Sequence, residues 1–473
     1  MQTRQGRRRS VHDAPFPHLA TLFAVLALAG ALFTAWATPP FQGADEPNHF
    51  HRAVLLTRGE LVGQRLHTAA GRQVGGGLAD PAVDAAAVPW KPLAFHPERK
   101  VDPDTVARTG AVRWTGRSRN EQFSNTAVYP PLLYLPQTAA IAAGQAAGLP
   151  VILTLKLART ANAVVCVALS AAALLIAGRR GWAMAAVLGL PMSVFLFGTV
   201  TQDGMIIALS ALGAALVLRP MGQGRPMREA ELWGAAACFA LVGMAKPPYS
   251  AFGLLLLAVP TRAPQARRIA AALAAPLLAL AWGAWMNAAV WARYSTEAAV
   301  DPSGQVRFLF GHPEAWAGLA WRTLSTYWLR YLQQLIGILG WLDARLPAWA
   351  YLGIGTALAA ALAMTWSGRP SRDWRFTPAA AIASALAAAA LVFVGLYLQW
   401  TPVGRPVVEG VQGRYLIPVL LFLPLAWAGG GRRWTGTKLG RPLARLGGFA
   451  CAGGMGLGLA ALVLTIVTRY YGP

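Results

Sequence analysis

Long apolar runs, separated by short polar gaps, occupy most of the chain. A membrane-spanning helix needs roughly 20 apolar residues. Nine runs approach that length: 19–37, 153–177, 182–198, 204–219, 268–291, 347–366, 376–399, 415–429 and 448–467. Two further runs, 231–244 and 249–261, are shorter, and the run 131–148 is ambiguous. The pattern predicts an all-α, polytopic integral membrane protein with 11–12 transmembrane helices.

Basic residues in the short gaps predict the orientation, because Lys and Arg are retained on the cytoplasmic side of a membrane. The gaps that we expect in the cytoplasm are the N-terminus, Gly178–Arg180, Arg219–Arg228, Arg262–Arg268, Arg369–Arg375 and Gly431–Arg445. This gives eleven crossings with the N-terminus inside and the C-terminus outside, provided that 131–148 does not cross. If 131–148 crosses, either 182–219 is one broken helix or Arg179 and Arg180 face outward, and charge counting leaves both open.

The same pattern divides the chain into six parts. The run 19–37 is followed by Thr38-Pro39-Pro40-Phe41 and not by a small-residue cleavage site, so we expect a retained first helix. The parts are a basic cytoplasmic N-terminus (1–18), the first transmembrane helix (19–37), a large periplasmic loop with amphipathic helices (38–130), a transmembrane bundle (131–291), a periplasmic or interfacial segment (292–346) and the C-terminal transmembrane helices (347–473).

Composition excludes a water-soluble fold, because 55% of the residues are hydrophobic and 13% are charged, against about 25% charged in soluble domains. The formal net charge of +23 would indicate nucleic acid in a soluble protein. Here the basic residues stand in gaps between apolar runs, so we expect no nucleic-acid partner. Cys166, Cys238 and Cys451 lie far apart inside apolar runs, which indicates neither a metal knuckle nor a disulfide framework.

Ionisable chemistry is concentrated outside the membrane. Residues 38–130 hold nine of the nineteen acids and four of the seven histidines. No Asp or Glu stands clearly inside an apolar run, where its charge would cost several kcal/mol. The acids that adjoin membrane segments on the outer side are Asp45, Glu46, Asp203, Asp343 and Glu409.

The sharpest motif is Asp45-Glu46-Pro47-Asn48-His49. Asp45 suits an N-cap and Pro47 suits the first turn, so a helix should begin here, with Asp45 and His49 on one face. With Glu46 they could bind a divalent cation, Mg²⁺ or Mn²⁺, or orient an acceptor hydroxyl for deprotonation. The alternative is that Asp45 only caps the helix and that His49 is a polar surface residue.

Further motifs accompany this one, and together they resemble a bacterial family of polytopic membrane proteins catalogued as a domain of unknown function. The resemblance runs from about residue 20 to 465 and rests on an Asp-Glu-x-x-His loop, a Tyr-Pro-Pro loop and a late Gln-Gly-Arg-Tyr signature. The residues that carry it are Asp45–His49, Asn125, Tyr129-Pro130-Pro131, Arg159, Asn162, Gln202-Asp203, Lys246-Pro247-Pro248-Tyr249, Gly340–Asp343 and Glu409–Tyr415.

That family is similar in layout to the C-type (GT-C) glycosyltransferases. The resemblance implies sugar transfer with inversion from a polyprenyl-phosphate donor to a glycan, lipid or protein acceptor, on the periplasmic side of the bacterial inner membrane. It makes Asp45 the general base or principal metal-site acid, Glu46 its supporting carboxylate and Asp203 the completing acid. Besides the donor and acceptor, the partners it implies are membrane lipids.

Residue chemistry fits this implication, because a fixed arginine fork binds phosphate better than a flexible cation. We expect Arg414 to bind the donor phosphate, with Lys246 as the second choice; each could instead be an ordinary interfacial side chain. Asp343 and Glu409 could equally cap a helix or pair with Arg414. The full set of substrate-binding candidates is Arg414, Lys246, Tyr415, Gln412, Tyr129, Asp343 and Glu409.

Two other classes of function remain compatible with the sequence. A lipid or polysaccharide transporter or flippase would also be all-helical, with broken helices and charges inside the membrane. A non-catalytic envelope assembly protein would need no acidic cluster. Convergence of Asp45, Glu46 and Asp203 with Arg414 would favour an enzyme, dispersed acids would favour scaffolding, and a polar path through the bundle would favour transport.

Overall fold

The structure is a computed structural model that describes residues 17–68, 71–290, 300–364, 371–427 and 440–472. Within these ranges, six helices are long and apolar enough to cross a membrane. They are α1 (Pro17–Ala37), α6 (Val151–Ala177), α9 (Asp203–Gln223), α11 (Gln265–Ala289), α15 (Thr377–Gln399) and α18 (Gly440–Tyr470). The all-α polytopic fold is confirmed. Most of the basic N-terminus, Arg369 and residues 431–439 of the predicted cytoplasmic loops lie outside the described residues.

Shorter or broken apolar segments complete the bundle. A break between α7 and α8 falls at Gly189 and Leu190, because Pro191 at the first position of α8 offers no N–H to the preceding turn. The five segments are α7 (Trp182–Leu188) with α8 (Pro191–Phe197), α10 (Glu229–Ala245), the 3₁₀ helix η4 (Pro247–Ala258), α14 (Ala348–Met364), and η6 (Gly413–Leu416) with α16 (Ile417–Leu420) and α17 (Leu423–Trp427). Together with the six long helices they make eleven segments, the number of crossings that the sequence predicts, and six of the eleven are long enough to cross a membrane.

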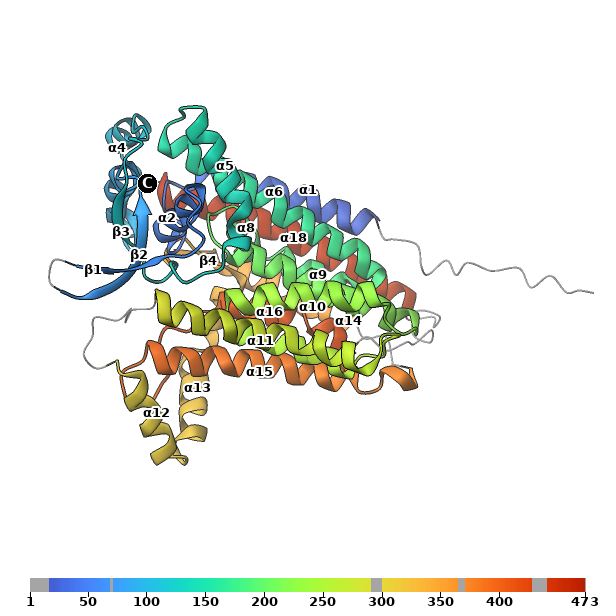
Figure 1. Cartoon of the computed structure of the whole chain (residues 1–473). Coiled ribbons are helices and arrows are strands. Elements are labelled where there is room, and N and C mark those ends of the chain that lie inside the picture. Colours follow the sequence, from blue (N-terminus) through green and yellow to red (C-terminus); the bar gives the residue numbers. More distant parts are fainter. Residues whose placement is uncertain (1–16, 69–70, 291–299, 365–370, 428–439, 473) are drawn as a thin grey trace, which may run out of the picture.

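Contacts between helix ends agree with this antiparallel order. Lys246 at the end of α10 meets Asp203 at the start of α9, and Thr377 at the start of α15 donates to the carbonyl of Ala258 at the end of η4. The start of α1 and the C-terminus lie at opposite ends of the bundle (Figure 1). We call the end that carries the C-terminus the polar end, because most of the hydrophilic segment 38–130 gathers there.

The ambiguous run 131–148 does not cross. It forms η2 (Pro131–Tyr134) and α5 (Leu135–Ala146), and twelve residues of helix span only about 18 Å. A Cβ at Gly144 of α5 would touch Thr154 near the start of α6, whereas Gln137 bonds Asn162 further along α6. The two helices are therefore antiparallel, and α5 extends outward from the polar end.

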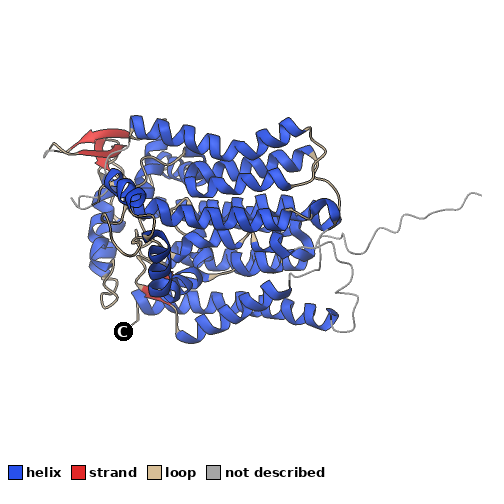
Figure 2. Ribbon diagram, turned by 90° about the horizontal axis from the view of Figure 1, so that it is seen from below, coloured by secondary structure: helices blue, strands red, loops and turns tan. Residues whose placement is uncertain are grey.

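A layer of short elements covers the polar end (Figure 2). It contains α2 (Glu46–Thr57), α3 (Ala82–Ala87), η1 (Val88–Leu93), α4 (Pro103–Gly110) and an antiparallel sheet of β1 (Gln64–His67), β2 (Gln73–Ala79) and β3 (Arg119–Gln122) in the order β1-β2-β3. Sequence reasoning expected helices alone in this loop. The sheet escapes notice because the centre of β2 is Gly75–Gly77, where a Cβ on Gly76 would lie 2.0 Å from the Glu121 carbonyl oxygen.

Two helices project sideways from the bundle near the polar end, α12 (Pro302–Gly311) and α13 (Ala315–Gly337) (Figure 1). The α13 side chains of Trp316, Trp321 and Trp328 are all exposed. Exposed tryptophans on such a helix are typical of the boundary between water and lipid. A small hairpin, β4 (Ile338–Leu339) with β5 (Ala344–Arg345), then leads into α14.

The centre of the bundle is α9. Of its most apolar stretch, 83% is buried within the protein, against 28–44% for the other five long helices, which expose more of their surface. Asp203 is the first residue of α9. The middle of the polar end is therefore the place where Asp203 meets the loops above the bundle.

Candidate functional site

Four charged side chains from four separate segments meet above α9. Asp203 starts α9, Lys246 ends α10, Asp45 precedes α2 and Arg414 lies in η6. Lys246 Nζ lies 2.6 Å from Asp203 Oδ1, and Arg414 Nε lies 3.6 Å from Asp203 Oδ2. Arg414 Nη2 lies 3.8 Å from Asp45 Oδ2. We call these residues the four-charge cluster; its formal charge is zero.

Asp45 is the most exposed member of the cluster. Its side chain is 35% exposed, against 20% for Lys246, 11% for Asp203 and 7% for Arg414. Asp45 is still largely buried, and this burial raises the pKa of its carboxyl above the ordinary value. The effect of burial outweighs the lowering of the pKa by the nearby charge of Arg414. Asp45 is therefore the carboxylate of the cluster best suited to accept a proton.

Arg414 is fixed by the glycine before it. A Cβ on Gly413 would lie 2.0 Å from the carbonyl oxygen of Tyr331 in α13, so only glycine allows this approach. The Gly413 N–H donates to Gln334 Oε1 at 2.8 Å. Among the described residues, Nε of Arg414 has no hydrogen-bond partner although it is buried. The Arg414 guanidinium is thus held in place, and its Nε–H remains able to donate a further hydrogen bond.

The Tyr415 ring is close to both cations of the cluster. Lys246 Nζ is 4.3 Å and Arg414 Cζ is 5.5 Å from the centre of its ring, distances at which the ring attracts a cation. Its carbonyl accepts a hydrogen bond from the Tyr249 hydroxyl. Gln412 begins the same turn, and within the described structure its buried Oε1 has no partner. The late Gln-Gly-Arg-Tyr signature thus contributes directly to the cluster.

Asp45 occupies the predicted N-cap position, but its side chain makes no capping hydrogen bond. That part of the prediction is wrong, because the backbone is left-handed here (φ +59°), not extended as in an ordinary N-cap. Its Oδ1 instead accepts a bond from Asn125 Nδ2 at 3.2 Å, and Asn125 accepts one from Asn48. Asn125 therefore orients the exposed carboxylate.

His49 is not the surface residue that one interpretation expected, since it is only 7% exposed. Its Nδ1 lies 2.5 Å from the Tyr134 hydroxyl, its Nε2 lies 3.5 Å from Thr201 Oγ1, and its ring stacks on Tyr129. Burial lowers the pKa of His49 to about 3, so the imidazole is neutral at physiological pH. His49 with Tyr129 and Tyr134 forms a rigid polar support beside the four-charge cluster.

The predicted metal site of Asp45, Glu46 and His49 does not form. The Glu46 carboxylate is fully buried and engaged by Arg159, while His49 is engaged by Tyr134. No group of three or more His, Cys, Asp or Glu side chains in the described part of the chain could hold a metal ion. Asp45, Glu46 and His49 therefore do not form a common ligand set in the described structure.

Asp343 and Glu409 do not pair with Arg414, contrary to one expectation. Asp343 Oδ2 lies 2.7 Å from Arg469 Nη2 and accepts the Phe95 N–H. Glu409 is 40% exposed and lies 3.7 Å from Arg405, four residues earlier. Both are thus engaged by other arginines.

The sequence analysis named Asn125 and Arg159 only as motif residues, and it assigned no role in the site or its support to them, to Tyr134 or to Thr201. Only Arg159 carried a clear signal, because a lone arginine inside the apolar run 153–177 must find a partner. The others are ordinary polar residues whose neighbours are distant in sequence.

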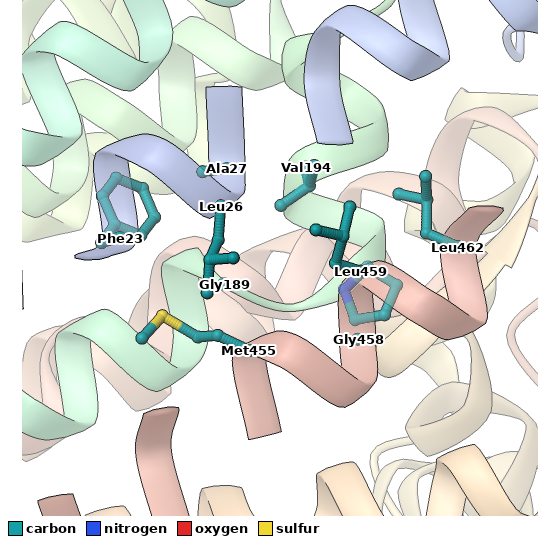
Figure 3. A pocket seen from close by; sticks show the side chains of 10 residues that line it. Phe23, Leu26, Ala27, Gly189, Val194, Met455, Gly458, Leu459 and Leu462 are labelled. Atoms are coloured by element: carbon teal, nitrogen blue, oxygen red, sulfur yellow. The ribbon is translucent and has the colours of Figure 1, made fainter. Parts of the chain in front are cut away.

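A small cavity lies elsewhere, inside the bundle between α1, the break before α8, and α18 (Figure 3). Its walls include Phe23, Leu26, Met455 and Leu459, and no polar or titratable side chain lines it. Such a space offers no chemistry, so the four-charge cluster remains the candidate site.

Residues 27–423 match the family described as "Predicted membrane protein (DUF2142)". The chain belongs to this DUF2142 family. The matched range includes all four residues of the four-charge cluster. No curated protein and no solved structure matches the chain. Because the DUF2142 description names no activity, function has to be argued from the site.

Proposed function

We propose that the protein is a membrane glycosyltransferase of the GT-C type, which transfers a sugar from a polyprenyl-phosphate donor to a glycan, lipid or protein acceptor of the cell envelope. The observation that carries the proposal is the four-charge cluster, in which a half-open carboxylate lies beside a buried guanidinium and an ammonium group. A base and a phosphate-binding pair at one end of a membrane bundle suit a donor whose lipid chain stays in the membrane.

In this mechanism Asp45 takes the proton of the acceptor hydroxyl. The acceptor oxygen forms a bond to the anomeric carbon while the bond from that carbon to the phosphate oxygen breaks. The electron pair leaves with the polyprenyl phosphate, and Arg414 and Lys246 stabilise its negative charge. A single displacement of this kind inverts the anomeric configuration. No step requires a metal ion.

Asp203 has a different role from Asp45. It bonds Lys246 and contacts Arg414, so it holds the two cations 2.6 Å and 3.6 Å from its own oxygens. A donor phosphate would share these cations with Asp203. Asp203 therefore keeps Lys246 and Arg414 oriented, and it leaves neither of them as an unpaired charge in a buried site.

The proposed location is the bacterial inner membrane, with the polar end facing the periplasm. Support comes from the opposite end, where short loops carry several arginines, as expected of cytoplasmic loops. Those described are Arg180, Arg225, Arg228, Arg262, Arg267, Arg268, Arg372 and Arg375. The partners are the lipid-linked donor, the surrounding lipids and the acceptor.

The test is transfer from radiolabelled polyprenyl-phosphate sugars by the purified protein in proteoliposomes with envelope glycans and lipids as acceptors. We expect transfer by the parent and a loss of about 10²–10⁴-fold in Asp45→Asn, the range for removal of a general base. Glu98→Gln, an exposed carboxylate in the same layer, is the matched control. Full activity of Asp45→Asn, or no transfer by the parent with any donor, would refute the proposal.

A further inference from the structure

A second pair of charges lies beside the four-charge cluster, completely enclosed. Arg159 of α6 and Glu46 of α2 form an ion pair in which both side chains are 0% exposed. Arg159 Nη2 lies 2.6 Å from Glu46 Oε2, and Arg159 Nε lies 2.8 Å from Oε1. Two buried charges cannot reach an aqueous substrate, so the pair acts through the structure that it holds.

All five N–H donors of the Arg159 guanidinium are in use. Two go to Glu46, and the remaining three go to the carbonyl oxygens of Ala35 (3.2 Å), Thr38 (2.7 Å) and Pro39 (3.0 Å). These carbonyls belong to the last turn of α1 and the linker after it. Arg159 therefore fixes the path by which the chain leaves α1.

Glu46 extends the contact to two further backbone positions. Its Oε2 accepts the Gly43 N–H at 3.1 Å, and its Oε1 accepts the Val200 N–H at 2.9 Å. Gly43 packs directly on the α8–α9 loop, since a Cβ there would lie 3.1 Å from Thr199 Cγ2. The pair thus joins the α1–α2 linker, α6 and the α8–α9 loop at one point.

This point is adjacent to both carboxylates of the four-charge cluster. Asp45 is the residue before Glu46, and Asp203 is three residues after Val200. Asp45 also has a left-handed backbone (φ +59°), which is uncommon for a non-glycine residue, although Asp adopts it more readily than most. The bonds to Gly43 and Glu46 on either side of Asp45 constrain this turn.

We infer that Glu46 and Arg159 are positioning residues, which hold Asp45 in its left-handed turn opposite Asp203 and Arg414 so that its carboxylate reaches the acceptor hydroxyl. This inference rests on the proposed function and changes the role of Glu46 from supporting acid to structural clamp. We call the two residues the Glu46–Arg159 clamp.

The test uses Glu46→Gln/Arg159→Met, because removing both members of a buried pair avoids a lone buried charge and preserves folding better than either single change. The matched control is Glu231→Gln/Arg225→Met. That pair makes two contacts, at 2.5 and 2.8 Å, at the opposite end of the bundle. Both variants are purified as full-length protein, checked for monodispersity and thermal unfolding, and reconstituted like the parent.

Two readouts are needed. Hydrogen exchange followed by mass spectrometry should show at least tenfold faster exchange in peptides that contain Gly43 and Val200. Each of these N–H groups has its own carboxylate oxygen in the parent, whereas the variant offers both a single glutamine Oε1 that Arg159 no longer holds. Steady-state transfer should show kcat reduced at least tenfold with the donor KM changed less than threefold, because Arg414 and Lys246 remain. Glu46→Asp/Arg159→Lys, which keeps both charges but not the five-donor fork, should recover only part of kcat.

The outcomes separate the clamp from the proposed function. Unchanged exchange at Gly43 and Val200 overturns the clamp, whether or not the parent transfers sugar. Faster exchange with unchanged kcat overturns its role in positioning Asp45. A donor KM that rises as much as kcat falls, or an equal effect in the control variant, also overturns it. No transfer by the parent overturns the proposed function instead, and the exchange data still decide whether the linker is clamped.

Discussion

Replacing Arg414 by lysine tests the phosphate-binding role most directly. The Arg414 side chain is only 7% exposed, its guanidinium contacts both carboxylates of the cluster at 3.6–3.8 Å and, among the described residues, its Nε has no hydrogen bond. Lysine keeps the positive charge but replaces the planar fork by a point charge. The donor phosphate then loses one charge-assisted hydrogen bond, worth about 1.5–3 kcal/mol. That range corresponds to a dissociation constant that is roughly 10- to 150-fold larger.

The assay is equilibrium binding of a polyprenyl phosphate to the protein in nanodiscs, at two salt concentrations. The control is Arg405→Lys, because Arg405 lies at the same end, is 58% exposed and contacts only Glu409 among the ion pairs described. We expect Arg405→Lys to bind like the parent. Equal affinity of Arg414→Lys and the parent would refute the reasoning, and so would equal losses in both variants, which would indicate a general effect of surface charge.

Three further predictions concern pH, stability and metal ions. Because the pKa of the Asp45 carboxyl is raised in the folded protein, transfer should decline as pH falls through a value above about 3.9. At pH 7 the charged carboxylate opposes folding for the same reason, so Asp45→Asn should unfold at the same or a higher temperature than the parent. Asp343→Asn should lower the free energy of unfolding by about 3–5 kcal/mol, measured by denaturation in detergent, because it leaves the buried Arg469 without its carboxylate, while donor affinity stays unchanged. Transfer should persist in excess EDTA, and loss of transfer that Mg²⁺ or Mn²⁺ restores would contradict the absence of a metal-ligand set in the described residues.

The fold was predictable because membrane insertion depends on local properties. An apolar run of sufficient length spans a bilayer whatever its neighbours are, so α1, α6, α9 and α11 follow directly from hydropathy. The segment 131–148 was ambiguous because its composition suits a membrane helix, and only its antiparallel packing on α6 keeps it outside. In the polar-layer sheet, β2 pairs with β3 between residues 40 to 46 positions apart, which no local pattern reveals, whereas β1 and β2 form a local hairpin.

The four-charge cluster was predictable in part for a similar reason. Asp203, Lys246 and Arg414 stand at ends of apolar segments, and segments that end on the same side of a membrane bring such residues to one level. The partner of each residue was not predictable. Glu46 and Asp45 are neighbours in sequence, yet Glu46 bonds an arginine 113 residues away and is buried, whereas Asp45 stays half open. The left-handed turn at Asp45 determines that the Glu46 carboxylate is buried and that the Asp45 carboxylate is partly exposed.

The polar groups just below the cluster argue for chemistry at one surface and against transport through the bundle. Asn162 of α6 lies at this level, but its Nδ2 donates to the carbonyls of Phe197 and Thr199 and its Oδ1 accepts from Gln137. These bonds satisfy the Asn162 amide and the end of α8. Deeper in the bundle α9 is packed on nearly all sides, and the cavity beside α1 is apolar. A transporter needs polar side chains along its path, whereas in the described part of the bundle the ion pairs of the four-charge cluster lie at the start of α9, at the surface where the proposed enzyme would meet its substrate.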